Sequence, residues 1–536
     1  MKKDITGKWD KYFIILVFLV FLMVGIKIYR DYGISSDELT ERVSTVVNAK
    51  YVMDVLGIDT SGIEVPELSE YPDRYYGTIL QMPTMILETG GRNLRDIFQG
   101  RHLYTFMICM AGYVAFFFLC KTIFGSNLAG LTGAMMVALY PRFFAEQFYN
   151  IKDMVFTSTF MAAMFFSVKL IESRFKWRWL FAFVVSAVIS TNVRIVGIIF
   201  LILILGYLLI DYILAKAVDG YERQCQAPFL CGIIMIIVYF GLFVLMMPSI
   251  WKSPVKGIIE VFAKFSQYDD WDSTIVFMGK VLNKSEIPWY YIPVWVLISV
   301  PVWYILLSMI TVIISIREIV RHSRAHDGLM VMLFSRYKYV VWCVSLAAIP
   351  WLGIVLMHST LYNGWRHCYF FVPVIVLFSL FGADFLMKKG KKYFVIIMAA
   401  IIIGLGAQTM WIWNNHPCEM VYLNSIGKYF GAYFDRDYWH VSTLSAFRYI
   451  AESEPGEKFS VGTSGNDLYM YLLEDEERNR IEEEEEPLYY IETYRGKVGN
   501  ELRKDGYEEI YSRVVDGYKI ATIYKRTETY GDHLEN

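Results

Sequence analysis

Two adjacent acidic residues, Asp37 and Glu38, follow directly after the first long apolar segment of the chain. A carboxylate held at a helix start beside a membrane can act as a general base toward an incoming hydroxyl group. The same residues also fit a structural role, because Ser35 and Glu38 have the spacing of a capping box and acidic side chains suit the first turn of a helix. The two interpretations are compatible, since a cap would also fix the position of a catalytic carboxylate.

Further ionisable residues gather at the ends of apolar segments that would face the same side of a membrane. They are Arg101, His102, Lys152, Asp153, Arg194, Arg366 and His367. Charges at membrane depth cost several kcal/mol unless they line a polar cavity or find partners. We therefore expect a wet, polar cavity at that surface. Simpler roles stay open, namely an ion pair at a helix start, snorkelling at a helix end and anchoring in the membrane interface.

These residue types together favour one kind of chemistry. Lysine and arginine suit a phosphate or pyrophosphate group, and they stabilise the charge on a departing phosphate. A nearby aspartate can accept the proton of a hydroxyl group. The combination predicts sugar transfer from a polyprenyl-phosphate carrier to a hydroxyl acceptor, and the sequence has no Walker A motif that would supply energy for transport.

A cofactor is not required by this pattern, although a divalent metal ion stays open. Histidines 102, 358, 367, 416, 440 and 533 would share the side on which the acidic residues collect. No HExxH or similarly tight ligand spacing accompanies them. We therefore expect no metal ligand among the site residues.

Composition and hydropathy place the site on a membrane protein. Of the 536 residues, 55% are hydrophobic and only 19% are charged, whereas soluble domains are about a quarter charged. Roughly 20 apolar residues cross a bilayer as a helix. The sequence predicts a polytopic α-helical membrane protein with about eleven spans, near 12–29, 102–122, 126–145, 153–172, 178–191, 194–214, 228–247, 290–315, 337–357, 366–386 and 393–413. The net charge of −2 gives no reason to expect a nucleic-acid partner.

The distribution of Lys and Arg predicts the orientation. Basic residues collect before the first span and after alternate later spans, which makes that side cytoplasmic. They include Lys2, Lys3, Lys8, Lys11, Arg174, Lys176, Arg178, Arg317, Arg321 and the run at 388–392. The other side then receives a first outer loop at 30–101 and a tail from 414 on.

We accordingly expect a transmembrane catalytic module over 1–413 and a small extracytoplasmic α/β domain over 414–536. In the tail, 441–452 has a helical pattern, whereas 458–463 and 518–526 alternate as strands do. In the outer loop, an amphipathic stretch with Leu39, Val43, Val46 and Val47 is expected to lie on the membrane as a partial lid. The DYW stretch at 437–439 is expected to pack the tail against the membrane interface.

The chain resembles the GT-C superfamily of integral membrane glycosyltransferases, with most similarity to the protein O-mannosyltransferase and aminoarabinose transferase branches. The resemblance lies in the acidic pair after the first span and in the stretches PRFFAEQFYNIKD (141–153), GWRHCYFFVP (364–373), HPCEMVYLN (416–424) and DRDYWHVS (435–442). It extends over nearly the whole chain. The sugar and the acceptor are left open by these motifs.

The resemblance implies roles for individual residues. Asp37 would be the base, and Glu38 would orient it or contact the acceptor. The carrier phosphate would be held by basic residues at the span ends, with candidates Arg101, Lys152, Arg194, Arg366 and His367; we place His102 and Asp153 in the same substrate-binding group. Transfer would invert the anomeric centre without a covalent enzyme intermediate.

Two other classes of protein stay open. A transporter or flippase for a lipid-linked sugar or polymer should show paired half-folds and broken helices near the membrane midplane. A non-catalytic assembly protein would use its tail for partners and would need no acidic pair beside a cavity. Exchange of Asp37 for asparagine separates the enzyme from both.

Overall fold

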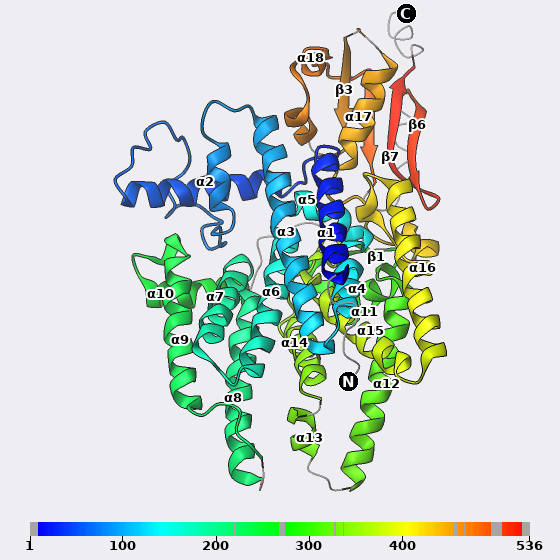
Figure 1. Cartoon of the computed structure of the whole chain (residues 1–536). Helices are drawn as coiled ribbons and strands as arrows, with labels where there is room; N and C mark the ends of the chain where they lie inside the picture. Colours follow the sequence, from blue (N-terminus) through cyan, green and yellow to red (C-terminus); the bar gives the residue numbers. More distant parts are fainter. Residues whose placement is uncertain are drawn as a thin grey trace, which may run out of the picture.

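The computed structural model describes residues 9–218, 221–266, 274–325, 329–335, 337–454, 456, 458–465, 467–494 and 506–527. Lys2, Lys3, Lys8 and His533, which entered the arguments on orientation and metal binding, lie outside the described residues. The described part is a helix bundle that carries a small sheet at one end (Figure 1). The predicted fold class, a polytopic helical membrane protein with a C-terminal α/β unit, is confirmed.

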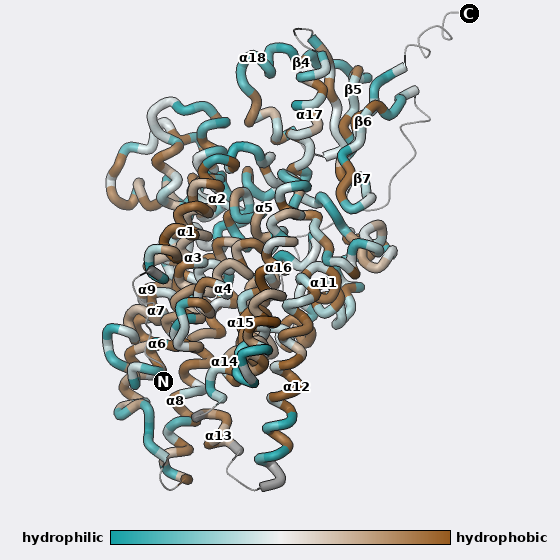
Figure 2. Tube along the Cα trace, turned by 45° about the vertical axis from the view of Figure 1, so that its right-hand side comes forward, coloured by the Kyte–Doolittle hydropathy of each residue, from teal (hydrophilic) through white to brown (hydrophobic). Residues whose placement is uncertain are grey.

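Among the described residues, eight helices are long and apolar enough to cross a membrane. The eight spans fall on α1 (Trp9–Ile28), α3 (Leu94–Phe124), α6 (Asp153–Glu172), α8 (Ile199–Ala217), α9 (Pro228–Leu245), α12 (Val302–Ala325), α14 (Lys338–Leu356) and α16 (Lys391–Asn415). The bent pair α4 (Asn127–Ala138) and α5 (Pro141–Tyr149) makes nine if it is taken as one span, and α7 (Trp177–Val193) and α15 (Phe371–Met387) are shorter apolar helices, so the eleven expected segments correspond to eight or nine helices of spanning length and two shorter ones. Figure 2 shows the bundle as mainly hydrophobic, with hydrophilic residues at its two ends.

The bend between α4 and α5 follows from a proline. Tyr140 precedes Pro141 and is extended, as residues before proline tend to be, and the two helices meet at 69°. A second break separates α7 from α8. Arg194 is extended there, and the short helix η2 (Ile195–Ile198) follows it. The sequence-based split between the fifth and sixth spans therefore falls where α7 ends.

Short helices and one hairpin connect the spans. They are η1 (Met82–Leu87), η3 (Pro248–Ile250), α10 (Pro254–Ser266), the antiparallel strands β1 (Thr274–Phe277) and β2 (Lys280–Asn283), η4 (Lys284–Glu286), α11 (Tyr291–Ser299), α13 (Leu329–Ser335) and η5 (Arg366–Cys368). The helix α2 (Glu38–Val55) lies across the bundle at the end that also carries the C-terminal sheet, opposite to α13 (Figure 1). A helix is thus present in the first loop where an amphipathic one was expected, and its buried residues are mostly polar, with Val47 packing against Leu68 and Tyr71.

The tail folds as a five-stranded mixed sheet in the order β4-β3-β5-β7-β6 with helix α17 against β5 and β7. Its elements are η6 (Glu419–Val421), η7 (Gly427–Tyr433), α17 (Ser442–Ser453), β3 (Phe459–Thr463), η8 (Asp467–Leu472), α18 (Asp475–Arg478), β4 (Ile481–Glu482), β5 (Tyr489–Thr493), β6 (Tyr507–Val515) and β7 (Tyr518–Arg526). The helix and both strands predicted in the tail are confirmed. The tail core also takes in Ile34 and Phe98, so the sheet is packed onto the membrane module.

Candidate functional site

Asp37 lies at the N-terminus of α2, and its side chain contacts a distant part of the bundle. It is the N-cap residue of α2, but its side chain makes no capping hydrogen bond. The expected capping box forms only in part. The backbone N–H of Ser35 donates to Glu38 Oε2 at 2.7 Å, whereas Ser35 Oγ donates to the carbonyl of Tyr149. Capping alone therefore does not account for Asp37.

A chain of alternating charges leads from Asp37 into the bundle. Arg366 Nη1 lies 2.8 Å from Asp37 Oδ2 and 3.0 Å from Asp153 Oδ2. The other carboxylate oxygen of Asp153 pairs with Arg194. The Arg366 and Asp153 side chains are each 1% exposed, whereas that of Asp37 is 38% exposed. Four segments distant in sequence thus meet at one ion-pair network with an open outer end at Asp37.

Aromatic rings hold the guanidinium of Arg366 from two sides. Its centre lies 5.0 Å from the ring of Tyr362 and 4.4 Å from the ring of Trp439. Such contacts suit arginine, which stacks on aromatic faces. Trp439 belongs to the DYW stretch and is 1% exposed. The expectation that this stretch packs against the membrane interface is wrong for Trp439, because its ring covers Arg366 inside the protein.

A second ion pair is formed one turn further along α2. Glu41 Oε1 lies 2.5 Å from Lys152 Nζ, and Glu41 Oε2 accepts a hydrogen bond from Gln81. Burial opposes the charged form of Glu41, but Lys152 and Gln81 outweigh burial and lower the pKa of this carboxyl group. The ammonium group of Lys152 also lies 3.4 Å from the ring centre of Tyr76. Glu41 and Tyr76 therefore both contact the ammonium group of Lys152 and fix its position.

Glu38 points away from this network. Consecutive helical residues do not share a face, whereas Asp37 and Glu41, four residues apart, do. Glu38 is 2% exposed, and its Oε1 lies 3.0 Å from His102 Nε2. Arg101 donates hydrogen bonds to Thr84 and Gln81. The structure therefore places Glu38, Arg101 and His102 behind the ion pairs; for Glu38, an orienting role was one of the two roles expected.

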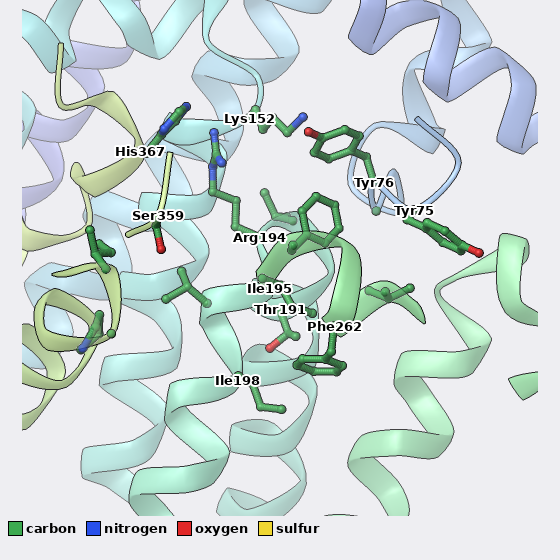
Figure 3. A pocket seen from close by; sticks show the side chains of 18 of the residues that line it. Tyr75, Tyr76, Lys152, Thr191, Arg194, Ile195, Ile198, Phe262, Ser359 and His367 are labelled. Atoms are coloured by element: carbon green, nitrogen blue, oxygen red, sulfur yellow. The ribbon is translucent and has the colours of Figure 1, made fainter. Parts of the chain in front are cut away.

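A cavity of about 440 Å³ adjoins the two ion-pair networks. Lys152, Arg194 and His367 line one end of it, and Ile198 and Phe262 lie toward the other (Figure 3). Among the described residues that line the cavity, none is Asp or Glu. Asp37, Asp153 and Arg366 are not lining residues, so Asp37 meets the cavity only through Arg366 and its partners.

The turn before η5 explains how Arg366 and His367 are presented. Asn363 and Gly364 both have positive φ angles, +55° and +67°. Asparagine and glycine tolerate this region best, so the Asn-Gly pair has a backbone role here. Burial, followed by the charges of Arg194 and Arg366, holds the pKa of His367 well below its ordinary value. The turn therefore presents Arg366 to the ion-pair network and His367 to the cavity.

Three residues of this site were not among the sequence-predicted candidates, namely Glu41, Tyr76 and Gln81. The sequence could have indicated a site role for Glu41, because this residue lies one turn from Asp37 on the same face of a predicted helix. Tyr76 and Gln81 lie in an irregular loop, and no sequence pattern indicated a site role for them. Within the described ranges, no group of three or more His, Cys, Asp or Glu side chains is placed to hold a metal ion.

A separate cluster joins the end of the first span to the tail. His416 Nε2 lies 3.0 Å from Asp31 Oδ2, and His416 Nδ1 lies 2.8 Å from Glu419 Oε1. Tyr32 donates a hydrogen bond to the same Glu419 carboxylate. Burial opposes the charged imidazole, but the hydrogen bonds to Asp31 and Glu419 outweigh burial and raise the pKa of His416 to about 9.

This cluster predicts a loss of stability in alkali. Because the folded-state pKa of His416 lies above its ordinary value of about 6.5, its stabilising contribution is complete below about pH 6.5 and is lost as pH rises through about 9. We expect the Tm of the purified protein to fall over this window, and His416→Gln to flatten that part of the profile. Thermal unfolding at a series of pH values checks this, and an equal fall in the variant would assign the effect to other groups.

Comparison with known proteins gives only distant similarity. No protein-family model matches the chain, and no curated protein matches it. Among solved structures, ArnT from Cupriavidus metallidurans bound to undecaprenyl phosphate has a TM-score of 0.40 at 11% identity, covering 97% of this chain and 98% of that one. The archaeal oligosaccharyltransferase AglB from Archaeoglobus fulgidus, in complex with an inhibitory peptide and a dolichol-phosphate, has a TM-score of 0.43 at 10% identity, covering 99% and 76%. Similarity at this level assigns neither a family nor an activity, so the function has to be inferred from the site.

Proposed function

We propose that the protein is a membrane glycosyltransferase of the GT-C type, which moves a sugar from a polyprenyl-phosphate carrier to a hydroxyl acceptor. One observation carries the proposal. The cavity has a basic end, with Lys152 and Arg194 but no carboxylate among its described lining residues, and a remainder that is mainly apolar. That division matches an amphiphile with an anionic head and a hydrocarbon chain.

Unsatisfied donors support an anion near this end. In the described part of the chain, the buried Nε of Arg194, which lines the cavity, has no hydrogen-bond partner, and neither have the buried Nε and Nη2 of Arg366, which does not line it. Buried donors without partners are costly, and an oxyanion would satisfy them. The carrier phosphate is therefore proposed to lie against Lys152 and Arg194, with Arg366 and His367 beside it.

Asp37 is proposed as the general base. Its carboxylate is fixed by Arg366 and remains partly open to the outside of the protein, where an acceptor can approach. Asp37 takes the proton of the acceptor hydroxyl as that oxygen forms a bond to the anomeric carbon. The bond between that carbon and the phosphate oxygen breaks at the same time, and the electron pair leaves with the polyprenyl phosphate. Attack from the face opposite the phosphate inverts the anomeric centre.

The remaining candidates are proposed as positioning residues. Glu38 and His102 fix the start of α2, and Arg101 fixes Gln81, which in turn orients Glu41. The end of the bundle that carries α2 and the C-terminal sheet is proposed to be extracytoplasmic, because the basic residues Arg317 and Arg321 lie on the opposite part of α12. The N-terminus would then be cytoplasmic.

Reconstituted protein in vesicles tests the function directly. A polyprenyl-phosphate sugar labelled in the sugar should be converted to free polyprenyl phosphate when cell-envelope acceptors are supplied, with the label transferred to the acceptor. A transporter or flippase would move the lipid and leave the bond between sugar and phosphate intact. Intact donor under all acceptor conditions, with the lipid bound or moved, would contradict the proposal.

Arg194 provides a prediction on donor binding. We expect Arg194→Ala to weaken the affinity for undecaprenyl phosphate about tenfold or more, since a charged hydrogen bond to phosphate is lost. Arg178→Ala is the matched control, because Arg178 is exposed near the other end of the same helix α7. Binding to purified protein in detergent measures both. Equal affinities of the two variants would remove Arg194 from the phosphate site.

A further inference from the structure

A mainly apolar cavity lies at the end of the bundle opposite to the C-terminal sheet, where Figure 1 shows α13. It has a volume of about 340 Å³, and its walls come from α6, α8, α13 and α14. Ile202 and Ile349 line it and are 53% and 44% exposed, so the cavity is open at the surface of the bundle. Among the described residues, none lines both this cavity and the one beside Arg194, so the mechanism proposed above makes no use of it.

The extent of this cavity along α14 matches one leaflet of a bilayer. Lys338 is the first residue of α14, and Ile349 is the last residue of that helix to line the cavity. The rise between these two positions is roughly 17 Å, whereas half of the hydrocarbon core of a bilayer is roughly 15 Å. The cavity therefore reaches from one membrane surface to about the midplane, which is the depth that one phospholipid occupies.

A cation stands at the outer mouth of the cavity. The ammonium group of Lys338 lies 5.0 Å from the ring centre of Tyr339, and both residues line the cavity. The carboxylate of Glu172, to which Tyr339 donates a hydrogen bond, pairs with Lys169. No Asp or Glu occurs among the described lining residues. Since basic groups near a membrane surface attract anionic lipids, this mouth suits a phosphate group.

A buried hydrogen-bond donor lies one helical turn deeper. Trp342 lines the cavity and is 7% exposed. In the part of the chain that the structure describes, its indole Nε1–H has no hydrogen-bond partner. A buried donor without a partner is costly, and an acceptor oxygen of a ligand would satisfy it. Lys338 and Trp342 are four residues apart, so they share one face of α14 and are separated by roughly 6 Å along its axis.

The order of these groups along α14 selects the ligand. From the membrane surface inward, the cavity offers a cation, then an N–H donor, then apolar side chains as far as Ile349. A glycerophospholipid carries a phosphate, then an ester carbonyl, then a hydrocarbon chain, in the same order. A polyprenyl phosphate has the phosphate and the chain but has no carbonyl group for the indole.

We propose that this cavity binds an anionic glycerophospholipid from the leaflet at the α13 end of the bundle, with its phosphate at Lys338 and an ester carbonyl oxygen accepting the hydrogen bond of Trp342 Nε1. The site goes beyond the proposed function and does not rest on it, because it uses none of the residues assigned to sugar transfer. A lipid bound there contacts α6, α8, α13 and α14 together, and its chain buries the apolar side chains that the protein leaves uncovered.

Two lipids that differ only in one linkage test the site. Dioleoyl phosphatidylglycerol has ester carbonyl groups, and its diether analogue has the same headgroup and chains without them. We expect the diester lipid to bind the purified full-length protein about fivefold more tightly, because the hydrogen bond from the indole forms only with the ester. Titration of the protein in detergent with each lipid, followed by native mass spectrometry, measures both affinities.

Trp342→Phe should bring the ratio of the two affinities to about one, because phenylalanine keeps an aromatic ring and lacks the indole N–H. Trp351→Phe is the matched control. Trp351 belongs to the same helix, and its buried Nε1 also has no partner among the described residues, but it lines neither cavity. This control should keep the fivefold preference. Because the ratio is measured within one protein, a smaller amount of folded variant does not change it.

Lys338→Gln tests the headgroup position, and we expect it to weaken both lipids about tenfold while the ratio between them persists. Lys391→Gln is its control, because Lys391 is the exposed first residue of α16, as Lys338 is the first of α14, and lines neither cavity.

Three results would overturn the proposal. The first is equal binding of the diester and diether lipids to the unaltered protein. The second is the same effect from a variant and from its control, which would show that the cavity does not select the lipid. The third is displacement of phosphatidylglycerol by an equal concentration of undecaprenyl phosphate, which would assign the cavity to the carrier.

Discussion

Asp37→Asn is expected to lower the rate of sugar transfer about a thousandfold, with little change in the affinity for the lipid carrier. A positioned general base contributes about 10²–10⁴ to the rate, and asparagine has the same shape but cannot take up the proton. The carrier phosphate is assigned to Lys152 and Arg194, which Asp37 does not contact, so binding should persist. Transfer of labelled sugar and equilibrium binding of undecaprenyl phosphate measure the two quantities separately.

Asp54→Asn provides the control for this substitution. Asp54 lies near the C-terminal end of the same helix α2, where it pairs with Lys50 at the protein surface. The same chemical change at that position should leave transfer unaltered. Turnover that survives in Asp37→Asn would reject Asp37 as the base. Loss of carrier binding together with turnover would instead show that Asp37 acts by holding Arg366.

The elements of the fold could be predicted because their signals are local. Long apolar runs indicated the eleven segments, and the interruption at Arg194 indicated the break between α7 and η2. The helix after Asp37 followed from polar residues typical of a helix start. Each of these features depends on a few neighbouring residues, so a single sequence contains the necessary information.

Contacts across the site could be anticipated only in outline. Asp153 and Arg366 are 213 positions apart, and topology predicted only that both lie at the same end of the bundle. Which of these residues make contact depends also on the direction in which each side chain leaves its helical turn. Glu38 faces His102, whereas Glu41, which carried no predicted role, faces Lys152.

Tertiary packing overrode one preference of residue type. An aromatic stretch beside a membrane is ordinarily expected in the interface. Trp439 instead covers a buried guanidinium, because the tail sheet is packed onto the first loop through Ile34 and Phe98.

Asp153 is the residue on which the stability of the site depends most. Its carboxylate is 1% exposed and is shared between Arg366 and Arg194. Asp153→Ala removes the carboxylate that pairs with Arg194 and leaves the buried Arg366 with Asp37 alone, and breaking such a buried pair costs about 3–5 kcal/mol. We expect a large drop in the Tm of the purified protein, together with loss of transfer because Arg366, which holds Asp37, loses one of the two carboxylates that fix its position.

Asp384→Ala is the matched control for that loss. Asp384 forms a helical pair with Lys388, whose side chain is 75% exposed, and an exposed pair contributes about 1 kcal/mol or less. A second test comes from the pair Asp153→Ala and Arg366→Met. Because methionine removes one of the two cations that Asp153 had paired with, the double variant should be more stable than Asp153→Ala alone, a coupling that a simple loss of packing would not give. A double variant that is less stable by the sum of both single effects would show that the network acts by packing and not by charge.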